Sequence, residues 1–211
     1  MKKKVIIFDI CGTLYHSNTT CDFCEWVENR FFYKNLLKFS KSIVGKIINK
    51  IFELFFNYDL IRNLHVWSLK GKSMDDIVNE ADAFVESFLK DKKIMEVHEI
   101  LSSKNKNNVV LISATLYPVA KAIAKNLRIA LFYSTSLSFD KNNILSGKID
   151  EDLSGNKHKL FKNKKVDFIA TDNLNDYKLC LMSEEVVIIS KQKHLKLWDK
   201  KKLKIDKLIK L

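Results

Sequence analysis

The chain has 211 residues, 46% of them hydrophobic, enough to bury the core of one large domain or of a domain with a smaller insertion. Its formal net charge of +12 comes almost entirely from lysine, because arginine occurs only at positions 30, 62 and 128. Proteins that bind nucleic acid usually add arginine for bidentate and stacking contacts. The charge therefore indicates a solvated surface and disfavours nucleic acid as the partner.

The N-terminus and the cysteines bear on localisation. Asp9 limits the first apolar run to about five residues, too few for a signal peptide. No stretch approaches the roughly 18 uncharged apolar residues of a membrane span. The four cysteines form no dense framework, and Cys21 and Cys24 make a lone CxxC that we expect to pack within a helix. We therefore predict a cytoplasmic protein with free thiols.

Apolar, β-rich runs predict the strands of a parallel sheet. Most of them are continuous rather than alternating, as is typical of strands covered on both faces. Helical patterns separate them at 114–129, where Pro118 suits the first turn, and at 175–185. Strands that alternate with helices indicate an α/β fold. The runs are 5–8, 109–113, 130–134, 167–170 and 186–190.

Three other parts of the chain have a different character. Residues 136–149 predict a small hairpin with its turn at 140–143. Residues 16–100 contain no comparable strand, and helices are expected there, including 73–89 and 92–103. The last twenty residues are basic and amphipathic, which is compatible with a closing helix, an edge strand or a surface-seeking element.

Residues 34–51 form an amphipathic pattern when projected as one helix. Lysines occupy one half of the projection, and leucine, isoleucine and valine fill the other. Two interpretations stay open. The segment is a helix that packs on its neighbours, or it rests on an anionic membrane surface or grips a lipid-like substrate.

Polar residues gather where the predicted strands end, which is where open α/β sheets bind ligands. Asp9 follows the first strand, and Ser113 ends the second run. Lys157 or Lys159 precedes the strand at 167–170, and Asp172 and Asp176 follow it. Lys157 is favoured over Lys159 because Leu160 and Phe161 lie behind it at helical spacing.

These segments resemble the four motifs of the haloacid dehalogenase superfamily, in its phosphoserine-phosphatase-like subfamily. FDICGTL stands for the DxDGT motif, VVLISAT for the strand ending in Ser or Thr, Lys157 for the lone lysine and TDNLND for the acidic pair. The resemblance implies a Rossmann-like parallel sheet with a helical cap inserted after the first strand. We expect the catalytic core at 1–15 and 100–211, and the cap at 16–99.

The resemblance also implies a function and a cofactor. The expected activity is Mg²⁺-dependent hydrolysis of a small phosphomonoester through an aspartyl-phosphate on Asp9. Asp9, Asp172 and the backbone carbonyl of Cys11 would hold Mg²⁺, a cation that prefers oxygen ligands. Asp176 would orient the lysine or a metal-bound water. The expected phosphate-binding residues are Gly12, Thr13, Ser113, Ala114 and Lys157.

Cys11 departs from the family, because the second aspartate of motif one is its acid–base group. Such assistance accelerates a reaction typically 10²–10⁴-fold, and a thiol is a poor substitute for a carboxylate. Three interpretations follow: a phosphatase that is slow or whose substrate has a good leaving group, a phosphotransferase, or a non-catalytic phosphate-binding protein. Asn18 also occupies the position at which phosphoserine phosphatase has a glutamate that binds the amino group of its substrate. Phosphoserine is therefore disfavoured as the substrate of this chain. A lipid phosphate at the inner membrane surface is a further alternative, with peripheral membrane contact.

Overall fold

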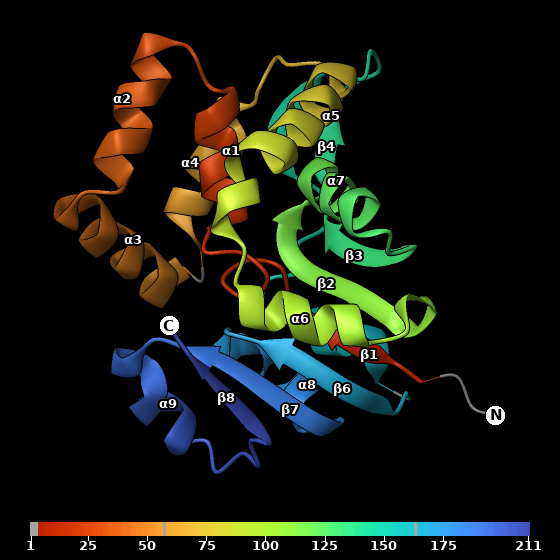
Figure 1. Cartoon of the computed structure of the whole chain (residues 1–211). Helices are drawn as coiled ribbons and strands as arrows, with labels where there is room; N and C mark the ends of the chain where they lie inside the picture. Colours follow the sequence, from red (N-terminus) through yellow and green to blue (C-terminus); the bar gives the residue numbers. More distant parts are fainter. Residues whose placement is uncertain (1–3, 57, 163) are drawn as a thin grey trace.

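The computed structural model describes residues 4–56, 58–162 and 164–211. Residues 1–3, 57 and 163, which fall within the segments predicted for the core and the cap, lie outside the described residues. A six-stranded parallel sheet, in the order β3-β2-β1-β6-β7-β8, forms the centre of the molecule and confirms the predicted α/β fold (Figure 1). Its strands are β1 (Ile6–Phe8), β2 (Val109–Leu116), β3 (Leu131–Thr135), β6 (Val166–Thr171), β7 (Ser183–Ser190) and β8 (Lys207–Lys210).

The central strand β1 is apolar on both faces because both faces are covered. Ile6 and Phe8 belong to one hydrophobic cluster, whereas Ile7 belongs to a second cluster on the other face. β1 pairs with β2 on one side and with β6 on the other. The carboxyl ends of these three strands therefore meet, and the residues that follow them come together.

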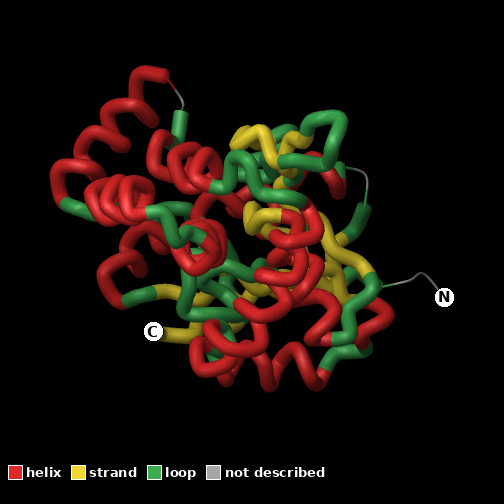
Figure 2. The backbone as a smooth tube through the Cα atoms, turned by 90° about the horizontal axis from the view of Figure 1, so that it is seen from above, coloured by secondary structure: helices red, strands yellow, loops and turns green. Residues whose placement is uncertain are grey.

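Between β1 and β2 the described chain is helical, as predicted. Figure 1 shows α2 and α3 on the outer side of α1 and α4, away from β1, β2 and β3. The tube view in Figure 2 also places helices at that outer edge. These helices are α1 (Thr19–Val27), α2 (Phe31–Ser40), α3 (Ile43–Phe56), α4 (Leu60–Ser68), α5 (Met74–Ala83) and α6 (Met95–Ser103).

The remaining elements agree with the sequence in type and differ in length. The predicted hairpin is confirmed as the antiparallel pair β4 (Leu137–Phe139) and β5 (Leu145–Ile149). Pro118 lies in the first turn of α7 (Tyr117–Leu127). The helix expected at 175–185 is shorter, since α8 (Tyr177–Cys180) ends before β7 begins. The C-terminal segment forms α9 (Leu195–Asp199) and the edge strand β8.

The expectation of one helix over 34–51 is wrong. The chain breaks at 41–42 into α2 and α3, and most of the apolar side chains of α3 are exposed rather than packed on neighbours. Gly45 and Asn49 are the buried positions of α3 instead. Among the residues that the structure describes, no helix combines the length and the apolar character needed to cross a membrane.

Candidate active site

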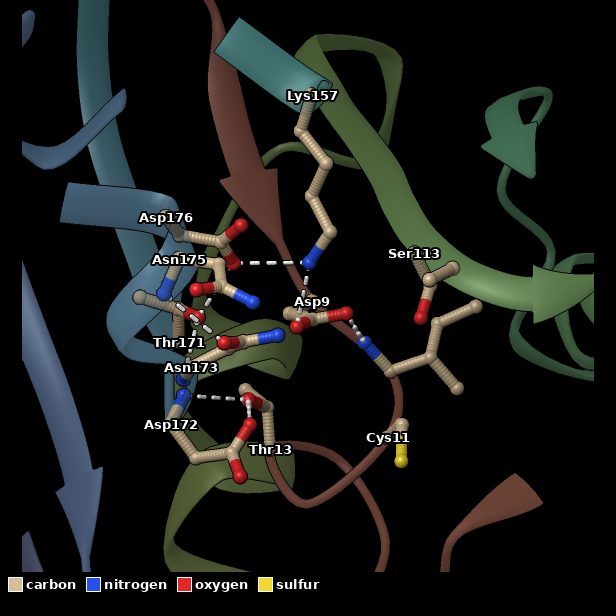
Figure 3. A network of polar contacts seen from close by, with 12 residues as sticks. Asp9, Cys11, Thr13, Ser113, Lys157, Thr171, Asp172, Asn173, Asn175 and Asp176 are labelled. Atoms are coloured by element: carbon tan, nitrogen blue, oxygen red, sulfur yellow. Dashed lines mark hydrogen bonds and ion pairs between the residues drawn. The ribbon is translucent and has the colours of Figure 1, made fainter. Parts of the chain in front are cut away.

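Asp9 lies at the carboxyl end of β1, buried between β2 and β6 (Figure 3). Its backbone N–H donates to the carbonyl oxygen of Ala170 at 3.0 Å, which continues the pairing with β6. Oδ1 of Asp9 accepts a hydrogen bond from the N–H of Ile10 at 2.7 Å. Oδ2 lies 2.6 Å from Nζ of Lys157. A buried carboxylate is costly without such partners, and the two contacts fix its orientation.

Lys157 bridges two carboxylates. Its Nζ also lies 2.8 Å from Oδ2 of Asp176, and all three side chains are buried. Burial alone would lower the pKa of Lys157, but the carboxylates of Asp9 and Asp176 raise it above its ordinary value. The ammonium is therefore charged at neutral pH. Lys159, the alternative lysine, is exposed.

Asp176 is held in place from β6. The Thr171 hydroxyl donates to Oδ2 of Asp176 at 2.7 Å, whereas Oδ1 of Asp176 is buried without a hydrogen-bond partner in the described part of the chain. Burial raises the pKa of Asp176, and Lys157 opposes that shift. Asp176 therefore positions the ammonium group that contacts Asp9. It does not contact Asp9 itself through a hydrogen bond in the described structure.

Asp172 is packed tightly against the loop after β1. The Thr13 hydroxyl donates to Oδ1 of Asp172 at 3.1 Å, and the N–H of Asp172 donates to the same hydroxyl at 2.9 Å. Gly12 has a φ of +69°, and a β-carbon there would lie 2.2 Å from Oδ2 of Asp172. Burial and the nearby Asp9 carboxylate raise the pKa of Asp172 to about 7. The loop therefore leaves room for the carboxylate but supplies no cation to it.

Cys11 lies in the same loop, and its thiol donates to the carbonyl oxygen of Ser17 at 3.1 Å. Burial, together with the carboxylates of Asp9 and Asp172, raises the pKa of Cys11 to about 12. The group is therefore a neutral thiol at physiological pH. A protonated thiol of that kind is neither a base nor a nucleophile.

Ser113 begins a chain of buried hydroxyl groups. Its Oγ lies 2.9 Å from Oγ1 of Thr115, which lies 2.6 Å from Oγ1 of Thr19 in α1. β2 does not end at Ser113 as the sequence predicts but runs on to Leu116, with an irregular register against β3 between Ile112 and Leu116. The chain of hydroxyls links β2 to α1.

Arg62 carries contacts that the sequence did not predict. From α4 its Nη2 donates to the carbonyl oxygen of Ala114 at 2.7 Å, to Oγ1 of Thr135 at 3.0 Å and to Oδ1 of Asp152 at 3.1 Å. Ala114 is one of the residues expected at the phosphate site. The only signal in the sequence was the scarcity of arginine in this lysine-rich chain.

A depression of about 400 Å³ opens beside the loop after β1. Cys11, Gly12 and Asp172 line one part of it, and Asn18 and Asp22 line another. The Asn18 side chain accepts from the N–H of Cys21 and so caps α1. The depression therefore reaches Asp172 and the loop after β1, whereas the buried Asp9 and Lys157 do not line it.

The donor set near Asp9 fits a divalent cation with oxygen ligands. Among the described residues, no three His, Cys, Asp or Glu side chains could hold a metal ion on their own. Asp9 and Asp172 offer two carboxylates, and the raised pKa of Asp172 reflects partly the repulsion between them. A bound cation would offset that repulsion. Mg²⁺ usually takes one or two carboxylates and completes its shell with water and substrate phosphate, which matches this set.

The chain resembles known proteins in sequence and in fold. The family model of haloacid dehalogenase-like hydrolases matches residues 6–179. A protein with unknown function from Bordetella pertussis Tohama I has a TM-score of 0.68 at 12% identity, with 99% of both chains covered. A phospho-aspartyl intermediate analogue of phosphoserine phosphatase has a TM-score of 0.56 at 16% identity, covering 99% of this chain and 94% of that one. Cytosolic 5′-nucleotidase IIIB bound to cytidine has a TM-score of 0.63 at 11% identity, covering 99% and 80%.

At these identities the structural likeness shows a shared fold. No curated protein sequence matches the chain significantly.

Proposed function

The chain belongs to the haloacid dehalogenase-like hydrolases, and we propose that it is a Mg²⁺-dependent phosphatase that hydrolyses a phosphomonoester through an aspartyl-phosphate on Asp9. The observation that carries the proposal is the position of Asp9. Its buried carboxylate lies at the carboxyl end of the central strand, 2.6 Å from the Lys157 ammonium and beside Asp172. The solved structure of phosphoserine phosphatase as a phospho-aspartyl analogue, on the same fold, supports this assignment.

In this proposal Asp9 is the nucleophile. One of its carboxylate oxygens forms a bond to phosphorus, and the bond from phosphorus to the leaving oxygen breaks with its electron pair. That oxygen takes a proton from water and leaves as the alcohol. Water then attacks the aspartyl-phosphate, which releases inorganic phosphate and restores Asp9. Lys157 contacts Asp9 and would stabilise the negative charge on the phosphoryl oxygens. Ser113, Ala114 and the loop residues Gly12 and Thr13 would bind the same oxygens.

The proposed Mg²⁺ ligands are Asp9, Asp172 and the backbone carbonyl of Cys11. When bound, the cation supplies positive charge that lets a carboxylate approach a dianionic phosphate. Thr13 positions Asp172 for this role through its two hydrogen bonds. Gly12 leaves the space that the Asp172 carboxylate needs.

Cys11 supports a second candidate function, phosphoryl transfer. With the pKa of Cys11 raised to about 12, the thiol cannot take a proton from an attacking water at neutral pH. The aspartyl-phosphate would then persist longer than with a carboxylate at this position. In phosphoryl transfer, a bound alcohol would receive the phosphoryl group in place of water. The remaining possibility is that the protein has lost turnover and only binds phosphate.

The helices between β1 and β2 would act as a cap over the site. We propose the boundaries expected from the sequence, a core at 1–15 and 100–211 and a cap at 16–99. The hydroxyl chain from Ser113 to Thr19 and the Arg62 contacts support a cap that is tied to the core near the phosphate site. A closed cap would exclude bulk water and select the substrate.

The test is phosphate release from a broad panel of phosphomonoesters with Mg²⁺, comparing the wild type with Asp9→Asn. Release by the wild type and none by Asp9→Asn is the expected result. With a substrate carrying a labelled phosphoryl group, an acid quench should trap label on the wild-type enzyme, and hydroxylamine should release that label. Failure of the wild type to release phosphate, or to form a labelled intermediate, from any substrate of the panel would overturn the enzymatic proposal.

A further inference from the structure

We call residues 31–56, which comprise α2, α3 and the turn between them, the α2–α3 hairpin. In an ordinary surface helix the apolar side is buried, but here polar and small residues are buried and most apolar side chains are exposed. α3 packs inward through a small and polar stripe, in which Gly45 and Asn49 are buried. A β-carbon on Gly45 would lie 2.6 Å from the carbonyl oxygens of Phe39 and Ser40, so the two helices approach closely there. Oδ1 of Asn49 accepts from the N–H of Ile61 at 2.7 Å, which ties α3 to α4.

Most of the apolar side chains of the hairpin are exposed, whereas Leu37 is buried. Phe31 is 81% exposed, Ile43 78% and Phe55 77%. Ordinary surface helices bury such side chains against the core, so the exposure of many of them on α2 and α3 indicates an interaction site. We call this set the outer face, and its largest members are Phe31, Phe32, Ile43, Ile47, Leu54 and Phe55.

Lysines accompany the outer face. The hairpin carries five lysines and a single acidic residue, Glu53. Lys34, Lys38 and Lys46 are exposed and form no ion pair within the described part of the chain. Exposed aromatic and aliphatic side chains beside uncompensated lysines are the pattern of helices that lie in the interface of an anionic bilayer.

We propose that the outer face of the α2–α3 hairpin binds the surface of a bilayer that contains anionic phospholipid. The positive charge of the hairpin favours an anionic bilayer as the partner of this face. A second copy of the chain on the same face would bring lysines against lysines, which is unfavourable in a symmetric contact. The inference depends on the hairpin and not on the proposed phosphatase activity.

A cleft of about 760 Å³ lies beside α3, and Lys50 and Glu53 line it. Asn156 and Asn175, the neighbours of Lys157 and Asp176, line the same cleft. The cleft therefore lies between α3 and the segments that carry Lys157 and Asp176, next to the exposed Lys50.

The test is co-sedimentation of the full chain with vesicles of phosphatidylcholine, with or without about 30 mol % phosphatidylglycerol. We expect binding to the anionic vesicles, little binding to the neutral ones, and loss of binding in about 0.5 M NaCl. Replacing three lysines, as in Lys34→Gln/Lys38→Gln/Lys46→Gln, should weaken partitioning about fivefold for each lysine removed. The matched control removes three exposed lysines elsewhere, Lys121→Gln/Lys141→Gln/Lys148→Gln.

The apolar contribution is tested with Ile43→Glu/Phe55→Glu, against the control Met95→Glu/Leu181→Glu at two other exposed apolar positions. The first pair should reduce binding at least tenfold and the second should not. Circular dichroism shows whether each variant is folded. Equal loss in the variant and its control, no binding to anionic vesicles, or a dimer that Ile43→Glu/Phe55→Glu dissociates would overturn the proposal. Phosphate release from a soluble substrate, measured in parallel, reports separately on the proposed activity.

Discussion

A β-carbon on Gly12 would lie 2.2 Å from Oδ2 of Asp172, closer than any real contact allows. The loop after β1 and the acidic residue after β6 are thus fitted to each other. Gly12 also has a φ of +69°, a conformation that favours glycine. The space beside Asp172 is a structural requirement of the candidate site, and it can be filled by substitution.

Gly12→Ala should abolish activity and destabilise the fold by about 2–4 kcal/mol, since strain of the left-handed backbone adds to displacement of Asp172. Chemical denaturation and phosphate release measure the two effects. Gly155→Ala is the matched control, because Gly155 has the same φ of +69° but a β-carbon added there would have nothing within 4 Å. If both variants behaved alike, the fit between Gly12 and Asp172 would carry no functional weight.

Lys157→Met should be strongly destabilising. It leaves the buried carboxylates of Asp9 and Asp176 without the cation that pairs with them. Breaking a buried ion pair by removing one partner costs about 3–5 kcal/mol. The midpoint of urea unfolding measures this cost. Lys159→Met, at the exposed neighbouring lysine, should leave the midpoint nearly unchanged. A similar shift in both variants would contradict the assignment of Lys157.

Mg²⁺ should raise the thermal unfolding midpoint of the wild type and not that of Asp172→Asn. At about 100 times its dissociation constant a ligand stabilises the folded state by about 2.7 kcal/mol, which corresponds to several degrees for a chain of this size. Asp199→Asn, an exposed carboxylate, is the control and should respond like the wild type. A midpoint that rises equally in Asp172→Asn would place the cation elsewhere.

Cys11→Asp should accelerate turnover if water is the acceptor. A carboxylate at this position could take the proton of the attacking water, a contribution of about 10²-fold or more. Two measurements check the effect. The steady-state rate should rise, and the amount of trapped phospho-enzyme should fall. Cys11→Ser adds no base and should stay close to the wild type. An unchanged amount of phospho-enzyme in Cys11→Asp would show that the thiol does not limit hydrolysis.

The sequence predicted the parts of this structure that depend on local pattern. Continuous apolar runs marked the strands of the parallel sheet, and the polar residues after them marked the edge where Asp9 and Lys157 meet. The sequence distinguishes Lys157 from Lys159 only by helical spacing, because the two lysines share one short segment. Only the three-dimensional turn of that segment buries one and exposes the other.

Contacts between segments that are distant in the chain could not be predicted from the sequence. Arg62 reaches Ala114 across 52 positions of the chain, and no local pattern announces such a contact. The periodicity of 34–51 likewise separates an apolar side from a polar side, but it does not show which of the two sides packs against the rest of the protein. Gly45 and Asn49 face inward instead, Gly45 where α3 approaches the end of α2 closely and Asn49 where its side chain accepts a hydrogen bond from Ile61.

Arg62→Lys should loosen α4 from the core. One guanidinium nitrogen, Nη2, donates to Ala114, Thr135 and Asp152, and the compact ammonium of lysine cannot reproduce that arrangement. Hydrogen bonds to charged groups contribute about 1.5–3 kcal/mol, so a loss of that order is expected. Hydrogen exchange should accelerate in α4 and at the segment around Ala114 together. Arg128→Lys, an exposed arginine, is the control. Faster exchange in α4 without any change at Ala114 would mean that Arg62 stabilises the helix alone and does not tie it to the candidate phosphate site.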